Sequence, residues 1–123
     1  MRCGIDIVQI SRIEDMSMNH EKSLSRFFTE REIMYCRQRV RGQYASLAGI
    51  FAAKEAFFKA LGTGFRKGKW TEVEIDHTDM GAPFFVFYGY YNQTAMALSG
   101  YMPALSISHD GDYAVAQVVW EIS

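Results

Sequence analysis

Two carboxylates and a lysine are the residues of this sequence best suited to bind a metal ion and a phosphate group. Asp6 lies in an apolar, β-branched stretch, residues 3–10, that predicts a strand. Glu55 lies between aromatic residues on a predicted helix, and Lys59 follows one turn later. A buried carboxylate needs a partner, because desolvation of its charge is costly. If the fold brings Asp6 and Glu55 together, their oxygens would suit Mg²⁺, with phosphate and water oxygens as further ligands.

Each of these residues also has an ordinary structural explanation. Asp6 could face water from an edge strand, and Glu55 with Lys59 forms the i,i+4 pair common on solvated helices. The functional interpretation of Asp6 is a metal ligand or the partner of a cation. His109 is a lone histidine at a strand end, a position typical of structural or solvated histidines.

A glycine loop follows the helix that carries Glu55. It begins Gly62-Thr63-Gly64 and continues through three cations to Lys69. Accessible backbone N–H groups and cations together favour a phosphate-rich ligand. The alternative is a helix cap and turn, since Gly-x-Gly is too short to count as a nucleotide-binding motif.

The element that must position these groups is a long helix, expected over residues 43–61. Its alanine, leucine, lysine and glutamate content favours helix, and Gly62 supplies the stop signal. A shorter helix is expected over residues 30–39, because Thr29 and Glu32 form a capping box.

Near the N-terminus, a helix is expected to begin at about Arg12. Ser11 would be its N-cap and Glu14 the third residue of a second capping box. Residues 16–25 are polar and are expected to form a looser segment.

The second half of the chain predicts mostly strands. Residues 71–77 and 84–88 form a hairpin, residues 90–100 a helix, and residues 104–109 and 113–122 a second strand pair around a tight turn. Helices and strands do not alternate regularly. We therefore expect one α+β domain over residues 1–123, with a mixed, mostly antiparallel sheet of about five strands packed on the long central helix.

Composition narrows the class of protein further. With 123 residues, 49% hydrophobic, the chain can bury a core as one domain. A formal net charge of −1 gives no basic field for nucleic acid. No signal peptide and no apolar run of membrane-spanning length is present, so a soluble, cytoplasmic protein is expected. Cys3 and Cys36 fit no zinc or redox spacing; unpaired thiols are expected, with a single disulfide left open.

Three stretches of the chain, in order, resemble one family. Residues 4–14 read GIDIVQISRIE, residues 51–64 read FAAKEAFFKALGTG, and residues 105–110 read LSISHD, followed by YAVA at 113–116. These stretches resemble the signature motifs of the holo-acyl-carrier-protein synthases, the short bacterial class of 4′-phosphopantetheinyl transferases. The resemblance spans nearly the whole chain.

The resemblance implies an enzyme that moves 4′-phosphopantetheine from coenzyme A to a serine of apo acyl carrier protein and so supports fatty acid biosynthesis. It assigns Mg²⁺ to Asp6 and Glu55, and catalysis to these two acids with Lys59. The residues it implies for coenzyme A binding are Lys54, Lys59, Gly62, Thr63, Gly64 and His109.

The resemblance also implies two kinds of protein partner. Arg12, Lys22 and Arg26 would contact the acidic carrier protein. Because this class resembles half of the longer transferases, a homotrimer with sites between subunits is expected. One departure concerns Ile50, which stands where many relatives carry an arginine.

Two other functions remain open on the sequence alone. One is a binding module for coenzyme A or a carrier protein that has lost turnover. The other is a purely structural oligomeric domain, in which Asp6 and Glu55 would be surface acids.

Overall fold

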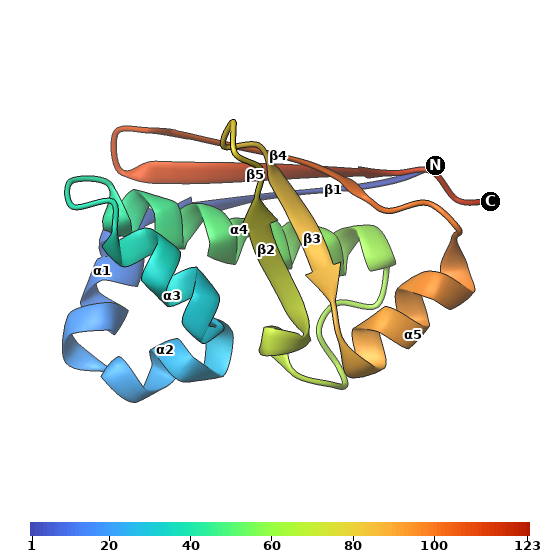
Figure 1. The fold of residues 1–123 in the computed structure, drawn as a ribbon, viewed down its shortest axis with the longest axis horizontal. Helices are drawn as coiled ribbons and strands as arrows, with labels where there is room; N and C mark the ends of the chain where they lie inside the picture. Colours follow the sequence, from blue (N-terminus) through green and yellow to red (C-terminus); the bar gives the residue numbers. More distant parts are fainter.

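A long helix, α4 (Gln43–Leu61), lies along one face of a three-stranded sheet in the computed structural model, which describes residues 1–123 (Figure 1). The smaller sheet and the other helices lie away from the large sheet, around α4. The strands are β1 (Arg2–Gln9), β2 (Val73–His77), β3 (Pro83–Phe87), β4 (Ala104–Asp110) and β5 (Tyr113–Trp120). The other helices are α1 (Ile10–Asn19), α2 (Glu21–Phe27), α3 (Glu30–Arg37), the 3₁₀ turn η1 (Trp70–Glu72) and α5 (Gly89–Leu98).

Both sheets are antiparallel. The larger has the strand order β1-β5-β4, so that β5, the last strand in sequence, is its centre, and the smaller is the β2-β3 hairpin. The predicted single-domain α+β class is therefore confirmed. The expected five strands are present, but they form two sheets because β3 and β4 are not hydrogen-bonded to each other.

The helix α4 has the predicted bounds and is buried on most of its circumference. Its alanines allow close approach to β1, where an added Cβ on Gly4 would lie 2.0 Å from the carbonyl oxygen of Ala56. Phe57 packs against Phe87 and Trp120 from the two sheets. This helix thus joins both sheets in one core, as is typical of a helix that is apolar all round.

The region before α3 differs from the prediction. The helix predicted near Arg12 is present as α1, which begins at Ile10. The loose segment expected over residues 16–25 is wrong, because the end of α1 and the helix α2 occupy it. The capping box predicted for Ser11 and Glu14 is wrong. The N-cap is Gln9, which makes no side-chain cap, and the Ser11 hydroxyl donates to Asp112 instead. The Thr29–Glu32 capping box of α3 is confirmed, although that helix ends at Arg37 rather than at residue 39.

No helix of this protein combines the length and the hydrophobicity required to cross a bilayer.

Both cysteines are free, as expected, with Cys36 buried and Cys3 exposed. Burial raises the pKa of the Cys36 thiol to about 12.

Candidate active site

The packing of β1 on α4 brings the predicted acids to the same place. Asp6 lies on the side of β1 that faces α4, with its side chain 16% exposed, so it does not project into water. The Lys59 ammonium donates to Asp6 Oδ1 at 3.1 Å and to the Ile5 carbonyl at 2.9 Å. The interpretation of Asp6 as the partner of a cation is therefore confirmed.

Glu55 lies one turn before Lys59 on α4 and is half-buried. Burial raises the pKa of Glu55, and the nearby charge of Asp6 raises it further, while Lys59 and Arg12 oppose the shift. Asp6, Glu55, Lys59 and Arg12 thus form one electrostatic cluster, which we call the acid cluster. A carboxyl group whose pKa lies toward neutrality is suited to accept a proton.

The donor set of the acid cluster fits Mg²⁺. Two carboxylates from different elements face the same region, but no group of three histidine, cysteine or acidic side chains is present. Magnesium is usually held by one or two carboxylates and completes its octahedron with water and substrate phosphates. Asp6 and Glu55 would supply the protein's share of such a site.

The glycine loop begins where α4 ends, one turn beyond Lys59. Gly62 has φ 92° and caps the helix, with its N–H donating to the carbonyls of Phe58 and Lys59. Gly64 also has a positive φ, and Thr63 is exposed between them. The loop therefore begins near the acid cluster, as the sequence predicts.

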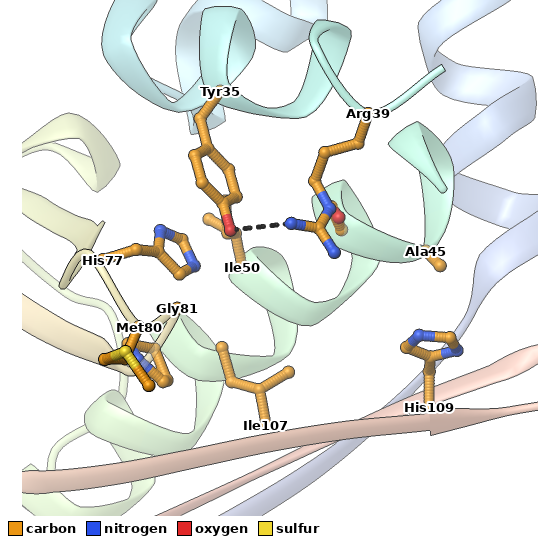
Figure 2. A pocket seen from close by; sticks show the side chains of 11 residues that line it. Tyr35, Arg39, Ala45, Ile50, His77, Met80, Gly81, Ile107 and His109 are labelled. Carbon is orange, nitrogen blue, oxygen red and sulfur yellow. Dashed lines mark hydrogen bonds between the residues drawn. The ribbon is translucent and has the colours of Figure 1, made fainter. Parts of the chain in front are cut away.

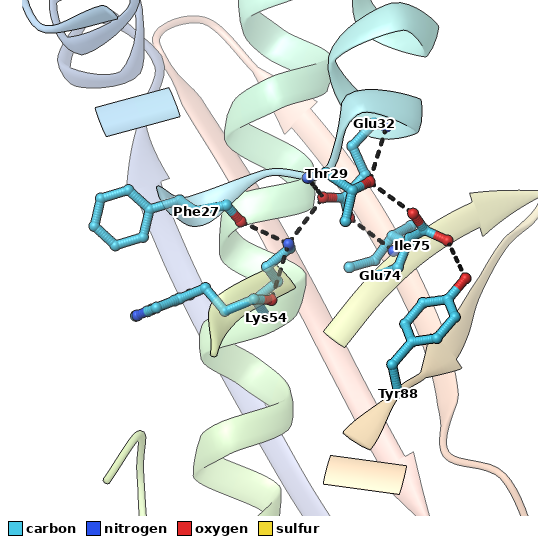
Figure 3. Close-up of polar contacts among 8 residues, drawn as sticks. Phe27, Thr29, Glu32, Lys54, Glu74, Ile75 and Tyr88 are labelled. Carbon is cyan, nitrogen blue, oxygen red and sulfur yellow. Dashed lines mark hydrogen bonds and ion pairs between the residues drawn. The ribbon is translucent and has the colours of Figure 1, made fainter. Parts of the chain in front are cut away.

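Lys54 does not lie where the sequence analysis expected. Its side chain is fully buried, and its ammonium donates to Glu32 Oε1 at 2.8 Å and to the carbonyls of Phe27 and Trp70 (Figure 3). All three donors are used inside the core. We therefore withdraw Lys54 from the coenzyme A contacts, because a ligand outside the core cannot reach it, and assign it to the core.

A hollow lies at the edge of the large sheet opposite the acid cluster, beside β4. It is a cavity of about 410 Å³ whose lining includes Arg39, His77 and His109 and no acidic residue. Figure 2 shows Tyr35 between His77 and Arg39. The His77 ring stacks on Tyr35 at 3.9 Å, and Arg39 donates to the Tyr35 hydroxyl at 3.1 Å. We call this the basic pocket; its basic side chains and planar rings suit an anionic, aromatic ligand.

Of the residues that line this pocket, His109 and Ile50 had been singled out from the sequence. Arg39 lies just after α3, where a cation beside a helix C-terminus has an ordinary structural explanation, and nothing in the sequence marked Tyr35 or His77. Ile50 also lines the pocket, although the residue is almost fully buried.

The three residues expected to contact the carrier protein lie on two neighbouring helices. Arg12 is on α1, and Lys22 and Arg26 are on α2. All three are exposed, and none forms an ion pair within the chain. Of the three, Arg12 also belongs to the acid cluster.

Comparisons with known proteins show the family of this chain. The model of the 4′-phosphopantetheinyl transferase superfamily matches residues 2–118. This chain belongs to that family. It is 43% identical over 120 residues to the holo-[acyl-carrier-protein] synthase of Trichlorobacter lovleyi, covering 96% of this chain and 94% of that protein. It is 39% identical to the synthase of Clostridium acetobutylicum, covering 97% and 95%.

A solved structure supports the same relationship. The holo-[acyl-carrier-protein] synthase of Helicobacter pylori, in complex with coenzyme A, is 34% identical and superposes with a TM-score of 0.80, covering 98% of this chain and 99% of that one. The fold and the family are thus shown over nearly the full length of both chains.

Proposed function

We propose that this protein transfers 4′-phosphopantetheine from coenzyme A to a serine of an apo acyl carrier protein. The observation that carries the proposal is the acid cluster, in which two carboxylates and a lysine from β1 and α4 meet in a member of this family. The transfer yields holo acyl carrier protein and adenosine 3′,5′-bisphosphate.

The chemical step is a displacement at phosphorus. The serine hydroxyl oxygen forms a bond to the β-phosphorus of coenzyme A, and the bond from that phosphorus to the bridging oxygen breaks. The electron pair leaves with adenosine 3′,5′-bisphosphate, and the hydroxyl proton passes to a base. We assign that base to Glu55, directly or through one water, because its pKa is raised toward neutrality.

The acid cluster and the glycine loop together would hold the pyrophosphate. Mg²⁺ bound by Asp6 and Glu55 would polarise the phosphorus and neutralise the leaving group. Lys59 supplies a cation beside Asp6. The N–H groups of Gly62 and Gly64 donate to carbonyls at the end of α4, so the glycine loop would meet a phosphate oxygen through the Thr63 N–H.

We place the nucleotide end of coenzyme A in the basic pocket. Arg39 and His109 can pair with the 3′-phosphate, and the stacked Tyr35 and His77 rings offer a planar surface for the adenine. In this chain Arg39 supplies a cation to a pocket in which Ile50 replaces the arginine of many relatives.

The acid cluster and the basic pocket lie at opposite edges of the large sheet, on β1 and on β4. A cyclic assembly can bring the β1 edge of one subunit beside the β4 edge of the next. The sheet face turned away from α4 carries exposed apolar side chains, including Ile5 at 58%, Ile7 at 64% and Tyr113 at 50% exposure. These features support a homotrimer with its active sites between subunits.

The carrier protein would bind at Arg12, Lys22 and Arg26, where exposed cations match its acidic surface. The two free thiols fit a reducing compartment. We therefore place the reaction in the cytoplasm, in the service of fatty acid biosynthesis.

The decisive experiment is intact mass spectrometry of an apo acyl carrier protein incubated with this protein, coenzyme A and Mg²⁺, beside an EDTA control. We expect a gain of one phosphopantetheine that EDTA abolishes. Gain that persists with EDTA would contradict the metal assignment. No gain, while a known transferase modifies the same carrier, would contradict the proposed function and favour a binding module.

A further inference from the structure

The first turn of α1 is held by the turn between β4 and β5, about a hundred residues further along the chain. The backbone N–H of Ile10 donates to the Asp112 carbonyl at 2.7 Å. The Asp112 carboxylate accepts from the Ser11 N–H at 3.0 Å and from the Ser11 hydroxyl at 2.7 Å. We call these three hydrogen bonds the hairpin clamp.

The hairpin clamp replaces a cap that α1 does not make for itself. The local N-cap, Gln9, forms no side-chain hydrogen bond, and the first turn of α1 contains no acidic residue. A carboxylate at this point satisfies free N–H groups and complements the helix dipole. Because it comes from another element, it also fixes where the helix begins relative to the sheet, which a local cap would not do.

The hairpin clamp positions α1, the helix that connects the strand carrying Asp6 to the residue proposed to contact the carrier protein, Arg12. β1 carries Asp6 and runs directly into α1, and Arg12 follows the clamped Ser11. On the other side, β4 ends beside the turn, and its His109 lines the basic pocket. The β4–β5 hairpin pairs with β1 along the whole strand, and the Asp112 carboxylate extends this contact from the strand to the first turn of α1.

We propose that Asp112 is a positioning residue for the carrier protein, acting through α1. This rests on the proposed function, because the carrier is the partner assigned to Arg12 and to the helix that follows α1. Asp112 does not touch the substrate; it sets the orientation in which Arg12 meets the acidic partner.

The test compares Asp112→Ala with Asp110→Ala. Both variants remove one exposed acid from the same hairpin, but only Asp112 belongs to the clamp. In Asp112→Ala the backbone bond to Ile10 remains, so the fold is retained. We expect KM for apo acyl carrier protein to rise about fivefold, the factor of a typical lost cap, with KM for coenzyme A unchanged. Asp110→Ala should leave both values unchanged.

A local cap distinguishes positioning from helix stability. Adding Gln9→Ser to Asp112→Ala supplies a hydroxyl at the N-cap without a bond to the hairpin. Any loss of melting temperature in Asp112→Ala should be recovered in the double variant, while its KM for the carrier protein stays above that of wild type. Full recovery of KM would overturn the proposal, because Asp112 would then act only as a helix cap.

Carrier affinity is measured in parallel by the fluorescence anisotropy of a labelled apo carrier protein. This readout does not require turnover, so it separates the two proposals. A wild-type protein that binds the carrier but transfers nothing would contradict the proposed function alone. Equal carrier affinity in wild type and in Asp112→Ala would overturn the role of Asp112.

Discussion

Glu55 has opposing charges around it, and their balance decides its protonation. Burial and Asp6 favour the neutral acid, whereas Lys59 and Arg12 favour the carboxylate. The pKa of Glu55 is raised because the first pair of effects outweighs the second. Catalysis needs the carboxylate form, whether Glu55 accepts a proton or binds a metal ion.

The pH dependence of turnover follows from this balance. As the pH falls through the raised pKa, Glu55 is protonated and kcat/KM should fall, at a higher pH than for an ordinary glutamate. Lys59→Met removes a cation that lowers this pKa, so the acid limb should move to still higher pH. A pH profile of kcat/KM for both proteins checks this; an acid limb that moves to lower pH in the variant would contradict it.

Removing the carboxylate should be more severe than shifting its pKa. Glu55→Gln keeps the size of the side chain but removes the carboxylate proposed as base and as metal ligand, so kcat should fall by about 10²–10⁴-fold. Circular dichroism should show an unchanged fold, because Glu55 makes no hydrogen bond within the core. Turnover within tenfold of wild type would exclude Glu55 from both roles.

Among the elements, α4 sets the positions of most others. Through Lys54 it is bonded to the end of α2, to α3 and to η1, so that four segments share one buried ammonium (Figure 3). Glu32 accepts further hydrogen bonds from the N–H groups of Thr29 and Ile75. The Lys54–Glu32 pair therefore connects helix capping to the edge of the small sheet.

Removing one partner of the Lys54–Glu32 pair should destabilise the fold more, per side chain changed, than removing both. Lys54→Met leaves the Glu32 carboxylate buried without its cation, so we expect unfolding free energy to fall by about 3–5 kcal/mol. In the double variant Lys54→Met/Glu32→Gln, the loss of unfolding free energy should be smaller than the sum of the losses in the two single variants. Urea denaturation of all four proteins gives the coupling; additive losses would contradict a coupled pair.

The contact of β1 with α4 depends on Gly4. Gly4→Ala would place a Cβ 2.0 Å from the carbonyl oxygen of Ala56, which forces the strand away from the helix. We expect a loss of about 1–3 kcal/mol and a marked loss of activity, since Asp6 lies two residues further on. Gly42→Ala is the matched control, because no atom lies within 4 Å of its added Cβ. Equal melting temperatures would contradict this account.

The sequence predicted the elements whose signals are local. The bounds of α4 and the Thr29 cap follow from residues next to each other in the chain, and both were confirmed. The helix α2 was missed because its seven residues are mostly polar and it is held by tertiary contacts, with Leu24 buried. The cap of α1 was also missed, because its acid comes from a distant hairpin.

The same distinction applies to the candidate site. The acid cluster could be predicted, because Asp6 and Glu55 are unusual in their own surroundings. Lys54 and Lys59 look alike in sequence, but one is buried and the other exposed, since they lie on different sides of α4. The basic pocket collects residues from α3, α4, the small hairpin and β4, and no local pattern identifies such a set.

At the scale of the whole molecule, the assembly can be tested by mixing two inactive proteins. Asp6→Asn damages the acid cluster, and Arg39→Ala the basic pocket. If each active site takes its acid cluster and its basic pocket from different subunits, trimers refolded from an equal mixture should regain about one quarter of wild-type activity. No regain, in trimers shown by light scattering to contain both chains, would place each site within one subunit.

The position of β5 at the centre of the large sheet governs how the protein is made. It pairs with both β1 and β4, yet it is the last strand to leave the ribosome. Until it emerges, β1 and β4 lack the strand that joins them, the part of α4 that packs on β5 is uncovered, and the hairpin clamp on α1 is absent. A stalled or shortened nascent chain would therefore expose most of the future core to chaperones and proteases, and active protein would accumulate only after residues 113–120 had been synthesised.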